Sequence, residues 1–304
     1  MKEIKSASIV GMGALGLMYA DIIQRHLGKD AVQFVMDEER LKRNSRTDYR
    51  INGKLVKFNL VSEKEVCFSD LVIVAVKFTS LSESLKVIEK LVGPETVIIS
   101  VLNGITSEEI LSERFGKEKI IYSVAQAMDS MRFGSEVRLT KEGELRIGIT
   151  SDGRKENLDA LENFFEKAGI KYTEEKDIIR CMWNKFMLNV GINQTCMAYN
   201  ATYSEVLNTK ELYDVFTGAM KEVMLIANKK QINLSEKEMK AWIELISTFA
   251  PDGTPSMGQD RIAKRKSEVE LFSGTIIKLG RETGIPVPVN QMLYEKIQQI
   301  ESEY

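Results

Sequence analysis

The sequence predicts an α/β protein with two domains, in which a doubly wound parallel sheet is followed by an all-helical C-terminal domain. The chain has 304 residues, which is more than one hydrophobic core usually holds. Apolar segments typical of buried strands alternate with helical segments up to residue 173, and from Asp177 onward every apolar segment has helical spacing. We therefore expect domains at residues 1–173 and 174–304.

The composition excludes several classes of function. The chain is 43% hydrophobic and 28% charged with a net charge of -2, and no basic run is interleaved with aromatic residues, so we expect no nucleic-acid partner. The first residues pass straight into a glycine-rich turn without the pattern of a signal peptide, and no stretch of about 18 apolar residues follows. We expect a cytoplasmic protein with no membrane partner.

Histidine and cysteine usage narrows the chemistry. His26 is the only histidine, which removes Ser-His and Cys-His catalysis and histidine-based metal sites unless His26 itself serves them. It lies near the end of the first predicted helix, where its expected role is electrostatic. Cys67, Cys181 and Cys196 show no C-x-x-C spacing, and we expect them to be reduced thiols in apolar surroundings. We predict no metal site, and if the protein is an enzyme we expect a proton donor other than histidine.

The chain opens with a predicted strand, a glycine turn and a helix, at residues 6–10, 11–16 (GMGALG) and 14–26. In such a turn Gly11 allows the tight reversal, Gly13 lets backbone N–H groups approach a pyrophosphate, and the last glycine permits close helix packing. The alternative is a turn with a purely structural role, but its position directly after a strand favours dinucleotide binding. We therefore predict a Rossmann-type domain whose cofactor-binding turn contains Gly11, Gly13, Ala14 and Gly16.

The second predicted strand, residues 31–36, ends at Asp37, where this fold places an acid for the hydroxyls of the adenosine ribose. A carboxylate there repels a 2′-phosphate, so the residue favours NADH. Arg40, Lys42 and Arg43 follow at once and could neutralise such a phosphate. The alternative is that these charges belong to a solvated helix start.

Two further apolar strands, residues 70–76 and 96–102, deliver Lys77 and Asn103 at their carboxyl ends. Ligands of open α/β sheets bind outside these ends, which favours roles for both residues in binding cofactor and substrate. The alternative is two ordinary polar residues at loop starts. The other elements expected in this domain are a strand at 120–125, an antiparallel hairpin at 135–149 around Gly143, a helix at 158–168 ended by Gly169, and an edge strand at 171–173.

The second half predicts helices at 178–200, 204–230, 235–249, 261–283 and 289–302. In the first of them Lys185, Asn189 and Asn193 stand at i, i+4 and i+8, so they form one polar row on an otherwise apolar helix. Burial of such a row costs free energy unless partners are present, and a ligand with a carbonyl oxygen or carboxylate would supply them. The alternative is a solvated stripe.

Ser256 and Glu268 are the other polar candidates in this half. Ser256 lies in the turn-rich segment 250–259 before a predicted helix start, and its spacing favours helix capping over binding of a ligand carboxylate. Glu268 shares a face of the predicted helix 261–283 with apolar residues, so its carboxylate should point inward, and Lys185 is a candidate partner. The alternative is a surface ion pair of Glu268 with Arg265 or Lys266.

Taken together, these motifs resemble ketopantoate reductase, also called 2-dehydropantoate 2-reductase, essentially from end to end. The matching segments are G-x-G-A-x-G, Val76-Lys77, Asn103-Gly104, W-x-K-x-x-x-N-x-x-x-N, P-S-M-x-Q-D, S-E-V-E and G-I-P-V-P. The resemblance implies a Rossmann domain and a helical domain with the active site in the cleft, NADPH as cofactor, and reduction of 2-dehydropantoate to (R)-pantoate in pantothenate biosynthesis. A homodimer is compatible with it.

The resemblance also implies roles for individual residues. The lysine that matches Lys185 protonates the ketone oxygen, the glutamate that matches Glu268 binds the substrate, and the lysine that matches Lys77 helps to hold the ligands. The residues that match Asn103, Asn189, Asn193 and Ser256 line the substrate and nicotinamide site.

The sequence departs from the family at two places. Where this chain has Asp37, the family usually carries an arginine that contacts the 2′-phosphate of NADPH, so NADH is an alternative cofactor. Near Tyr203 and Gly253 some members have asparagines that touch the substrate. The alternative activity is that of a D-2-hydroxyacid dehydrogenase acting on another branched or aromatic 2-oxo acid. A second alternative is a non-catalytic dinucleotide sensor, which would not require the set of Lys185, Ser256 and Glu268.

Overall fold

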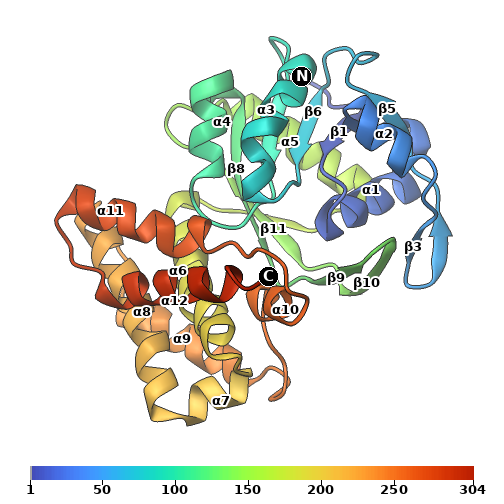
Figure 1. The fold of residues 1–304 in the computed structure, drawn as a ribbon. Coiled ribbons are helices and arrows are strands. Elements are labelled where there is room, and N and C mark those ends of the chain that lie inside the picture. The colour runs from blue at the N-terminus through green and yellow to red at the C-terminus, as the bar shows by residue number, and fades with distance from the viewer. Residues whose placement is uncertain (1) are drawn as a thin grey trace. The chain divides into compact units, whose positions relative to one another are not determined.

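The computed structural model describes residues 2–304 and divides into two compact units (Figure 1). The first unit ends at Ile178 and the second is Ile179–Tyr304. In the described chain all strands belong to the first unit, and the second is helical. The predicted fold class, a doubly wound α/β domain followed by a helical domain, is confirmed.

The first unit is built on an eight-stranded sheet with the order β12-β11-β8-β7-β6-β1-β2-β5. From β5 to β8 the strands are parallel, β11 is antiparallel to β8, and β12 is parallel to β11. The order β5-β2-β1-β6-β7-β8 is that of dinucleotide-binding sheets. Strands that follow β1 in the chain are added first on one side of β1 and then, from β6 on, on its other side. The strands are β1 (Ala7–Val10), β2 (Val32–Met36), β5 (Leu60–Ser62), β6 (Leu71–Val74), β7 (Val97–Ser100), β8 (Ile120–Gln126), β11 (Glu144–Gly148) and β12 (Tyr172–Glu174).

Helices cover both faces of this sheet (Figure 1), which explains why the central strands β1, β6 and β7 are buried at every position. Successive residues of β1 face opposite layers: Ile9 packs in the core with α1 (Ala14–Leu27) and α5 (Lys155–Ala168). Val10 packs in the core with α3 (Leu81–Leu91) and α4 (Ser107–Phe115). The remaining short elements are α2 (Glu38–Asn44) and the 3-10 turns η1 (Lys29–Ala31), η2 (Phe78–Ser80) and η3 (Lys117–Lys119).

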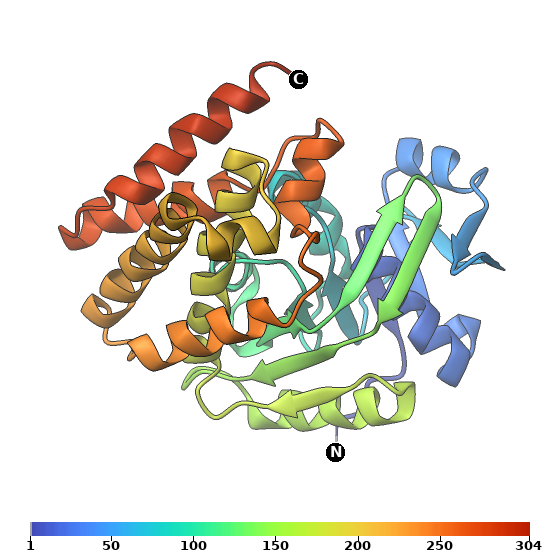
Figure 2. The same ribbon diagram turned by 90° about the horizontal axis from the view of Figure 1, so that it is seen from below.

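A second, four-stranded sheet has the order β4-β3-β10-β9, and Figure 2 shows its β9–β10 hairpin extending from the first unit. Its strands are β3 (Tyr49–Ile51), β4 (Lys54–Val56), β9 (Asp129–Phe133) and β10 (Glu136–Lys141). The predicted hairpin at 135–149 is therefore wrong. β10 pairs with β9 and β3, whereas β11 pairs with β8 and β12, so the two strands that flank Gly143 belong to different sheets.

The second unit packs around the helix α6. Gly191 allows α6 to approach α8 closely, because a Cβ atom there would lie 2.6 Å from Cγ of Met220. On another side, the rings of Phe186 and Phe272 have centroids 6.1 Å apart. The helices are α6 (Ile178–Tyr199), α7 (Tyr203–Asn208), α8 (Lys210–Lys229), α9 (Glu236–Ser247), α10 (Ser256–Ile262), the π-helical η4 (Glu270–Gly274), α11 (Thr275–Thr283) and α12 (Pro288–Glu301).

The continuous helix predicted for residues 261–283 is wrong. α10 ends at Ile262, Lys264 takes a left-handed conformation with φ of 49°, and the chain becomes helical again only at Glu270. The buried carboxylate of Glu301 holds the intervening segment by accepting a hydrogen bond from the backbone N–H of Ser267. Glu268 consequently lies in a turn directly before a π-helical segment, a kind of irregularity that is frequent at functional sites.

Within residues 2–304 we find no helix that is both long and apolar enough to cross a lipid bilayer.

Candidate active site

The glycine turn closes so tightly that two of its residues must be glycine. Gly11 has φ of 112°, and a Cβ atom there would lie 2.4 Å from the carbonyl oxygen of Ala75. A Cβ atom on Gly16 would lie 2.1 Å from the carbonyl oxygen of Gly11. These contacts bring the start of α1 against the ends of β1 and β6.

Gly13 differs, because a Cβ atom there would be in ordinary contact with the protein, 3.5 Å from the oxygen of Ala75. Internal packing therefore does not demand glycine at this position, whereas close approach of a ligand would. Gly13 caps α1 without a side-chain hydrogen bond, Ala14 is the first residue of the helix, and its first turn has no acidic residue. Backbone N–H groups and the positive end of the helix dipole are thus available to an anion, and the turn fits the diphosphate of a dinucleotide.

Asp37 lies at the carboxyl end of β2 and caps α2. One carboxylate oxygen, Oδ1, accepts the backbone N–H of Arg40 at 2.8 Å, and Oδ2 lies 3.4 Å from Nε of the same residue. Arg40 also lies 3.7 Å from Oε2 of Glu83, in the first turn of α3. This surface therefore carries two negative side chains around one positive side chain, and the Asp37 carboxylate keeps lone pairs for further donors.

Lys77 and Asn103 follow the neighbouring parallel strands β6 and β7. Lys77 is exposed and precedes η2, and Asn103 is half-buried and precedes Gly104, whose φ is 92°. Because β1, β2, β6 and β7 are parallel, their carboxyl ends share one edge of the sheet. The structure therefore gathers the glycine turn, Asp37, Lys77 and Asn103 at one edge, as the sequence predicts.

A buried chain of hydrogen bonds through Glu108, Ser107 and Ser100 supports the segment before Asn103. The sequence analysis does not predict it. Glu108 is 1% exposed, and its Oε2 accepts the hydroxyl of Ser107 at 2.8 Å. The hydroxyls of Ser107 and Ser100 lie 2.8 Å apart, and Ser100 accepts the N–H of Leu102. Burial raises the pKa of Glu108 to about 7, against the attraction of the Ser107 hydroxyl and nearby backbone amides. An acid in the first turn of a helix normally suggests only a favourable helix dipole, so the sequence carried no clear signal.

In the second unit the predicted polar row of α6 is present and extends to Ser256. Ser256 donates its hydroxyl to Oδ1 of Asn193 at 3.0 Å, and Nδ2 of Asn193 donates to Oδ1 of Asn189 at 3.3 Å. Asn189 and Asn193 are 8% and 5% exposed. Both carbonyl oxygens accept within the row, so the N–H groups of Asn189 are left to donate to a ligand.

The capping role expected for Ser256 is wrong. Pro255 occupies the cap of α10, Ser256 is the first residue of the helix, and the cap makes no side-chain hydrogen bond. The hydroxyl of Ser256 is directed to α6 instead.

Lys185 is half-buried on α6, and burial lowers the pKa of its ammonium group to about 8. The negative charge of Glu268 acts in the opposite direction and raises this pKa, so the two groups interact electrostatically. The alternative partners considered for Glu268 pair elsewhere: Arg265 lies 2.8 Å from Asp260, and Lys266 lies 3.7 Å from Glu301. This electrostatic interaction favours Lys185 as the cation that interacts with Glu268.

The single histidine, Cys67 and Cys196 do not belong to the polar row of α6, whereas Cys181 lies beside Lys185 on this helix. His26 contacts the backbone oxygen of Ile22 through Nδ1 at 2.9 Å, and its ring would meet a side chain at Gly169. Cys196 is buried, but Cys67 is exposed, so the apolar surroundings expected for it are wrong. Cys181 is half-buried one helical turn before Lys185. In the part of the chain that the structure describes, no three potential metal ligands of the His, Cys, Asp or Glu type gather.

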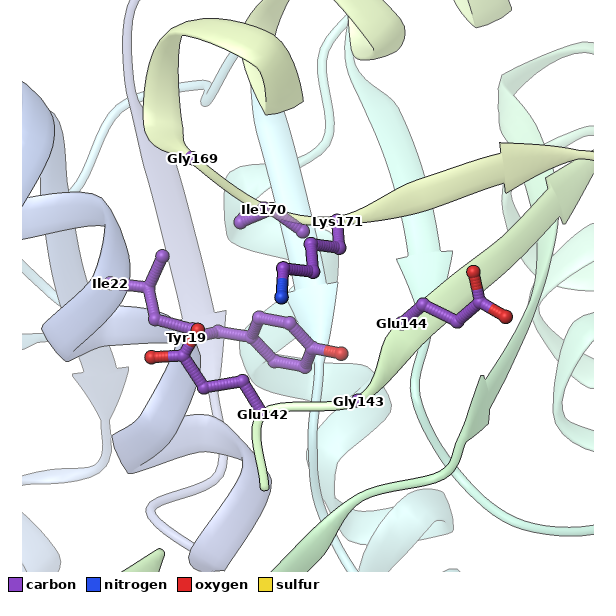
Figure 3. Close-up of a pocket in the computed structure, with 8 residues that line it drawn as sticks. All are labelled: Tyr19, Ile22, Glu142, Gly143, Glu144, Gly169, Ile170 and Lys171. Carbon is purple, nitrogen blue, oxygen red and sulfur yellow. The ribbon is translucent and has the colours of Figure 1, made fainter. Parts of the chain in front are cut away.

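Figure 3 shows a small pocket elsewhere in the first unit, between α1, the β10–β11 turn and the start of β12. None of its residues belongs to the predicted site, and the Tyr19 hydroxyl within it donates a hydrogen bond to the sulfur of Met128 at 3.9 Å. The pocket is lined by Tyr19, Ile22, Glu142, Gly143, Glu144, Gly169, Ile170 and Lys171.

Comparison with known proteins shows the family to which the chain belongs. The family model described as ketopantoate reductase PanE/ApbA matches residues 7–152, and the model of the ketopantoate reductase PanE/ApbA C terminal matches residues 177–301. The chain belongs to the ketopantoate reductase family. Curated relatives are named 2-dehydropantoate 2-reductase, an NAD(P)H-dependent oxidoreductase, and this chain is an enzyme of that class.

The similarity covers nearly the full length of the relatives. A 2-dehydropantoate 2-reductase of Aquifex aeolicus is 26% identical over 309 residues, which covers 95% of this chain and 94% of that protein. The structure of the 2-dehydropantoate 2-reductase of Geobacter metallireducens is 26% identical, with a TM-score of 0.85 over 97% of this chain and 99% of the other. D-mandelate dehydrogenase, solved with NADH and anilino(oxo)acetate, shares the fold at 21% identity and a TM-score of 0.88, with 98% of each chain covered.

Proposed function

We propose that this enzyme reduces a 2-oxo acid to the 2-hydroxy acid with Lys185 as the general acid, and that its substrate is 2-dehydropantoate, which gives (R)-pantoate for pantothenate biosynthesis. The observation that carries the proposal is the directed row on α6. Ser256 donates to Asn193 and Asn193 donates to Asn189. The row therefore ends in the N–H donors of Asn189, one helical turn from the ammonium group of Lys185. Such an arrangement suits a ligand that offers only acceptors, as a 2-oxo acid does.

Lys185 supplies the proton. A reduced nicotinamide held at the glycine turn would supply the hydride for the carbonyl carbon. As the C=O double bond becomes a single bond, the ketone oxygen takes a proton from Nζ of Lys185, which is left as a neutral amine and regains its proton from water. A pKa of about 8 suits this step, because the group is mostly protonated at neutral pH and yet releases its proton more readily than an ordinary lysine.

Glu268 keeps Lys185 charged in its half-buried position. Burial alone disfavours the ammonium form, and the nearby carboxylate offsets part of that cost. We propose that Glu268 also contacts the substrate, that Asn189 and Asn193 bind it through their remaining N–H donors, and that the Ser256 oxygen accepts a hydrogen bond from one of its hydroxyl groups.

We propose NADH as the preferred cofactor. The ribose of NADH can donate to the Asp37 carboxylate, whereas the 2′-phosphate of NADPH would bring nearly two further negative charges beside Asp37 and Glu83. Arg40 is shared between these two carboxylates and is therefore less available to a phosphate. NADPH, which the family resemblance implies, is the alternative. The remaining cofactor contacts in this proposal come from the glycine turn, Lys77 and Asn103.

An aromatic or branched 2-oxo acid is the second candidate substrate. Tyr203 and Phe249 form an edge-to-face pair with centroids 5.5 Å apart, and the N–H of Tyr203 donates to the carbonyl of Gly253, near Ser256 in the chain. Some relatives of the resemblance carry asparagines near Tyr203 and Gly253, where this chain has this pair of aromatic rings. The rings would favour a hydrophobic side chain on the substrate over the hydroxyl of 2-dehydropantoate.

A panel of substrates and cofactors tests the proposal. The protein is mixed with NADH or NADPH and with 2-dehydropantoate, phenylglyoxylate or a branched 2-oxo acid, and oxidation of the cofactor is followed by absorbance. Turnover with at least one oxo acid is expected. If the protein binds cofactor tightly but turns over none of them, the proposal is wrong and a non-catalytic sensor becomes the better explanation.

A further inference from the structure

Arg132, on strand β9, reaches the glycine turn although it lies 120 residues further along the chain. Its Nη1 donates a hydrogen bond to the backbone oxygen of Met12, between Gly11 and Gly13. Its Nε donates to the oxygen of Gly134 at 2.7 Å, and the guanidinium carbon lies 5.7 Å from the ring centroid of Tyr49. The side chain is therefore held in place from two sides before any ligand binds.

No carboxylate among the residues that the structure describes pairs with this guanidinium. Arg132 is half-buried, and within residues 2–304 its hydrogen bonds go to two backbone carbonyls, with no ion pair. Charged groups that are partly removed from water without a counter-charge cost free energy, and an anion that binds beside them recovers it. Two carbonyls leave several of the five guanidinium N–H donors unused.

The surroundings of Arg132 also favour an anion. α1 begins at this turn with no acidic residue in its first turn and no side-chain cap, so the N–H groups and the dipole of the helix attract the same kind of ligand as the guanidinium does. Both β9 and β10 contact α1, and Figure 2 shows the β9–β10 hairpin projecting from the eight-stranded sheet. The central sheet does not need this hairpin for its own pairing.

We propose that Arg132 binds the diphosphate of the dinucleotide cofactor, and that the four-stranded sheet serves to carry this cation to the glycine turn. The inference rests on the proposed function, because it takes the turn as the cofactor site. The donors that Arg132 retains bind phosphate oxygens while Nη1 keeps its bond to Met12.

Direct binding measurements on the whole protein test this role without relying on activity. Calorimetry gives the Kd for NADH and ADP, and an NMR titration gives that for adenosine, which lacks phosphate. Arg132→Met should weaken binding of NADH and ADP by about tenfold to a hundredfold, the usual contribution of hydrogen bonds to charged groups, and leave adenosine binding unchanged. Arg132→Lys should recover part of the loss, because it restores the charge without the planar fork.

Arg138→Met is the matched control. Arg138 lies on the adjacent strand β10, is exposed, and stacks over Phe133 with 5.4 Å between the guanidinium carbon and the ring centroid, so it resembles Arg132 but does not touch the turn. This variant should bind all three ligands normally. Unchanged ADP affinity in Arg132→Met would overturn the inference, as would an equal loss for adenosine, which would show that Arg132 only supports the turn. If the unaltered protein binds neither NADH nor ADP, the proposed function fails together with the inference.

Discussion

The rate of 2-oxo acid reduction is expected to fall as the pH rises above about 8, because Lys185 must carry a proton to act as the acid. An ordinary lysine has a pKa of 10.5, and burial lowers that of Lys185 to about 8. The alkaline limb of the pH profile thus reports the environment of this one residue. The reverse reaction, in which the neutral amine accepts the proton, should increase over the same range.

The size of the effect follows from the pKa. Well above pH 8 the protonated fraction of Lys185 falls about tenfold per pH unit, so kcat/KM for reduction should fall with the same slope. An unperturbed lysine would instead give a level profile to about pH 10. Glu268 raises the pKa of Lys185, so Glu268→Gln should move the alkaline limb to lower pH.

The assay is steady-state oxidation of the reduced cofactor at saturating cofactor concentration, with kcat/KM for the oxo acid measured at closely spaced pH values. Far-UV circular dichroism at each pH controls for unfolding. A level profile up to pH 10 would refute the assignment of Lys185, and a limb that moves to higher pH in Glu268→Gln would refute the interaction with Glu268.

Two further predictions concern the first unit. Asp37→Arg should shift the ratio of kcat/KM values toward NADPH by more than about tenfold, or 1.4 kcal/mol, since it removes a like charge from the 2′-phosphate, and an unchanged ratio would mean that Asp37 does not contact the ribose. The pKa of Glu108 is raised from 4.5 to about 7 in the folded protein, because burial favours the neutral carboxyl group. The stability that the neutral group contributes is therefore complete below pH 4.5 and is lost as the pH rises through about 7. In urea unfolding Glu108→Gln should therefore match the unaltered protein near pH 4 and exceed its stability by about 3 kcal/mol at pH 8, whereas equal stability at both pH values would contradict the burial argument.

The sequence was sufficient to predict the elements that depend only on residues close to one another in the chain. The strand, glycine turn and helix around Gly11 are one contiguous unit, and the row of Lys185, Asn189 and Asn193 follows from the periodicity of a single helix. The continuous helix at 261–283 failed because apolar spacing does not reveal the left-handed turn at Lys264. The hairpin around Gly143 failed because alternation indicates a strand but not its partner, and the partners of β10 are β9 and β3.

Arg132 and Glu108, which the sequence analysis does not single out, depend on contacts between distant segments. Arg132 and Met12 are far apart in the chain, and an arginine in a short strand has no distinguishing pattern. Glu108 is adjacent to Ser107 in sequence, but only the packing of α4 on the sheet buries its carboxylate. For Ser256, spacing favours helix capping over ligand binding, because spacing alone cannot show that the hydroxyl is directed to Asn193.

The most direct test of the central claim is the single-turnover rate of Lys185→Ala with reduced cofactor and the best oxo acid of the panel. Loss of a positioned general acid should lower this rate by at least about a hundredfold, while the Kd for the cofactor, whose proposed site lies in the first unit, changes little. A folded Lys185→Ala protein that reduces the oxo acid at a near-normal rate would contradict the claim and leave Lys185 with a structural role only.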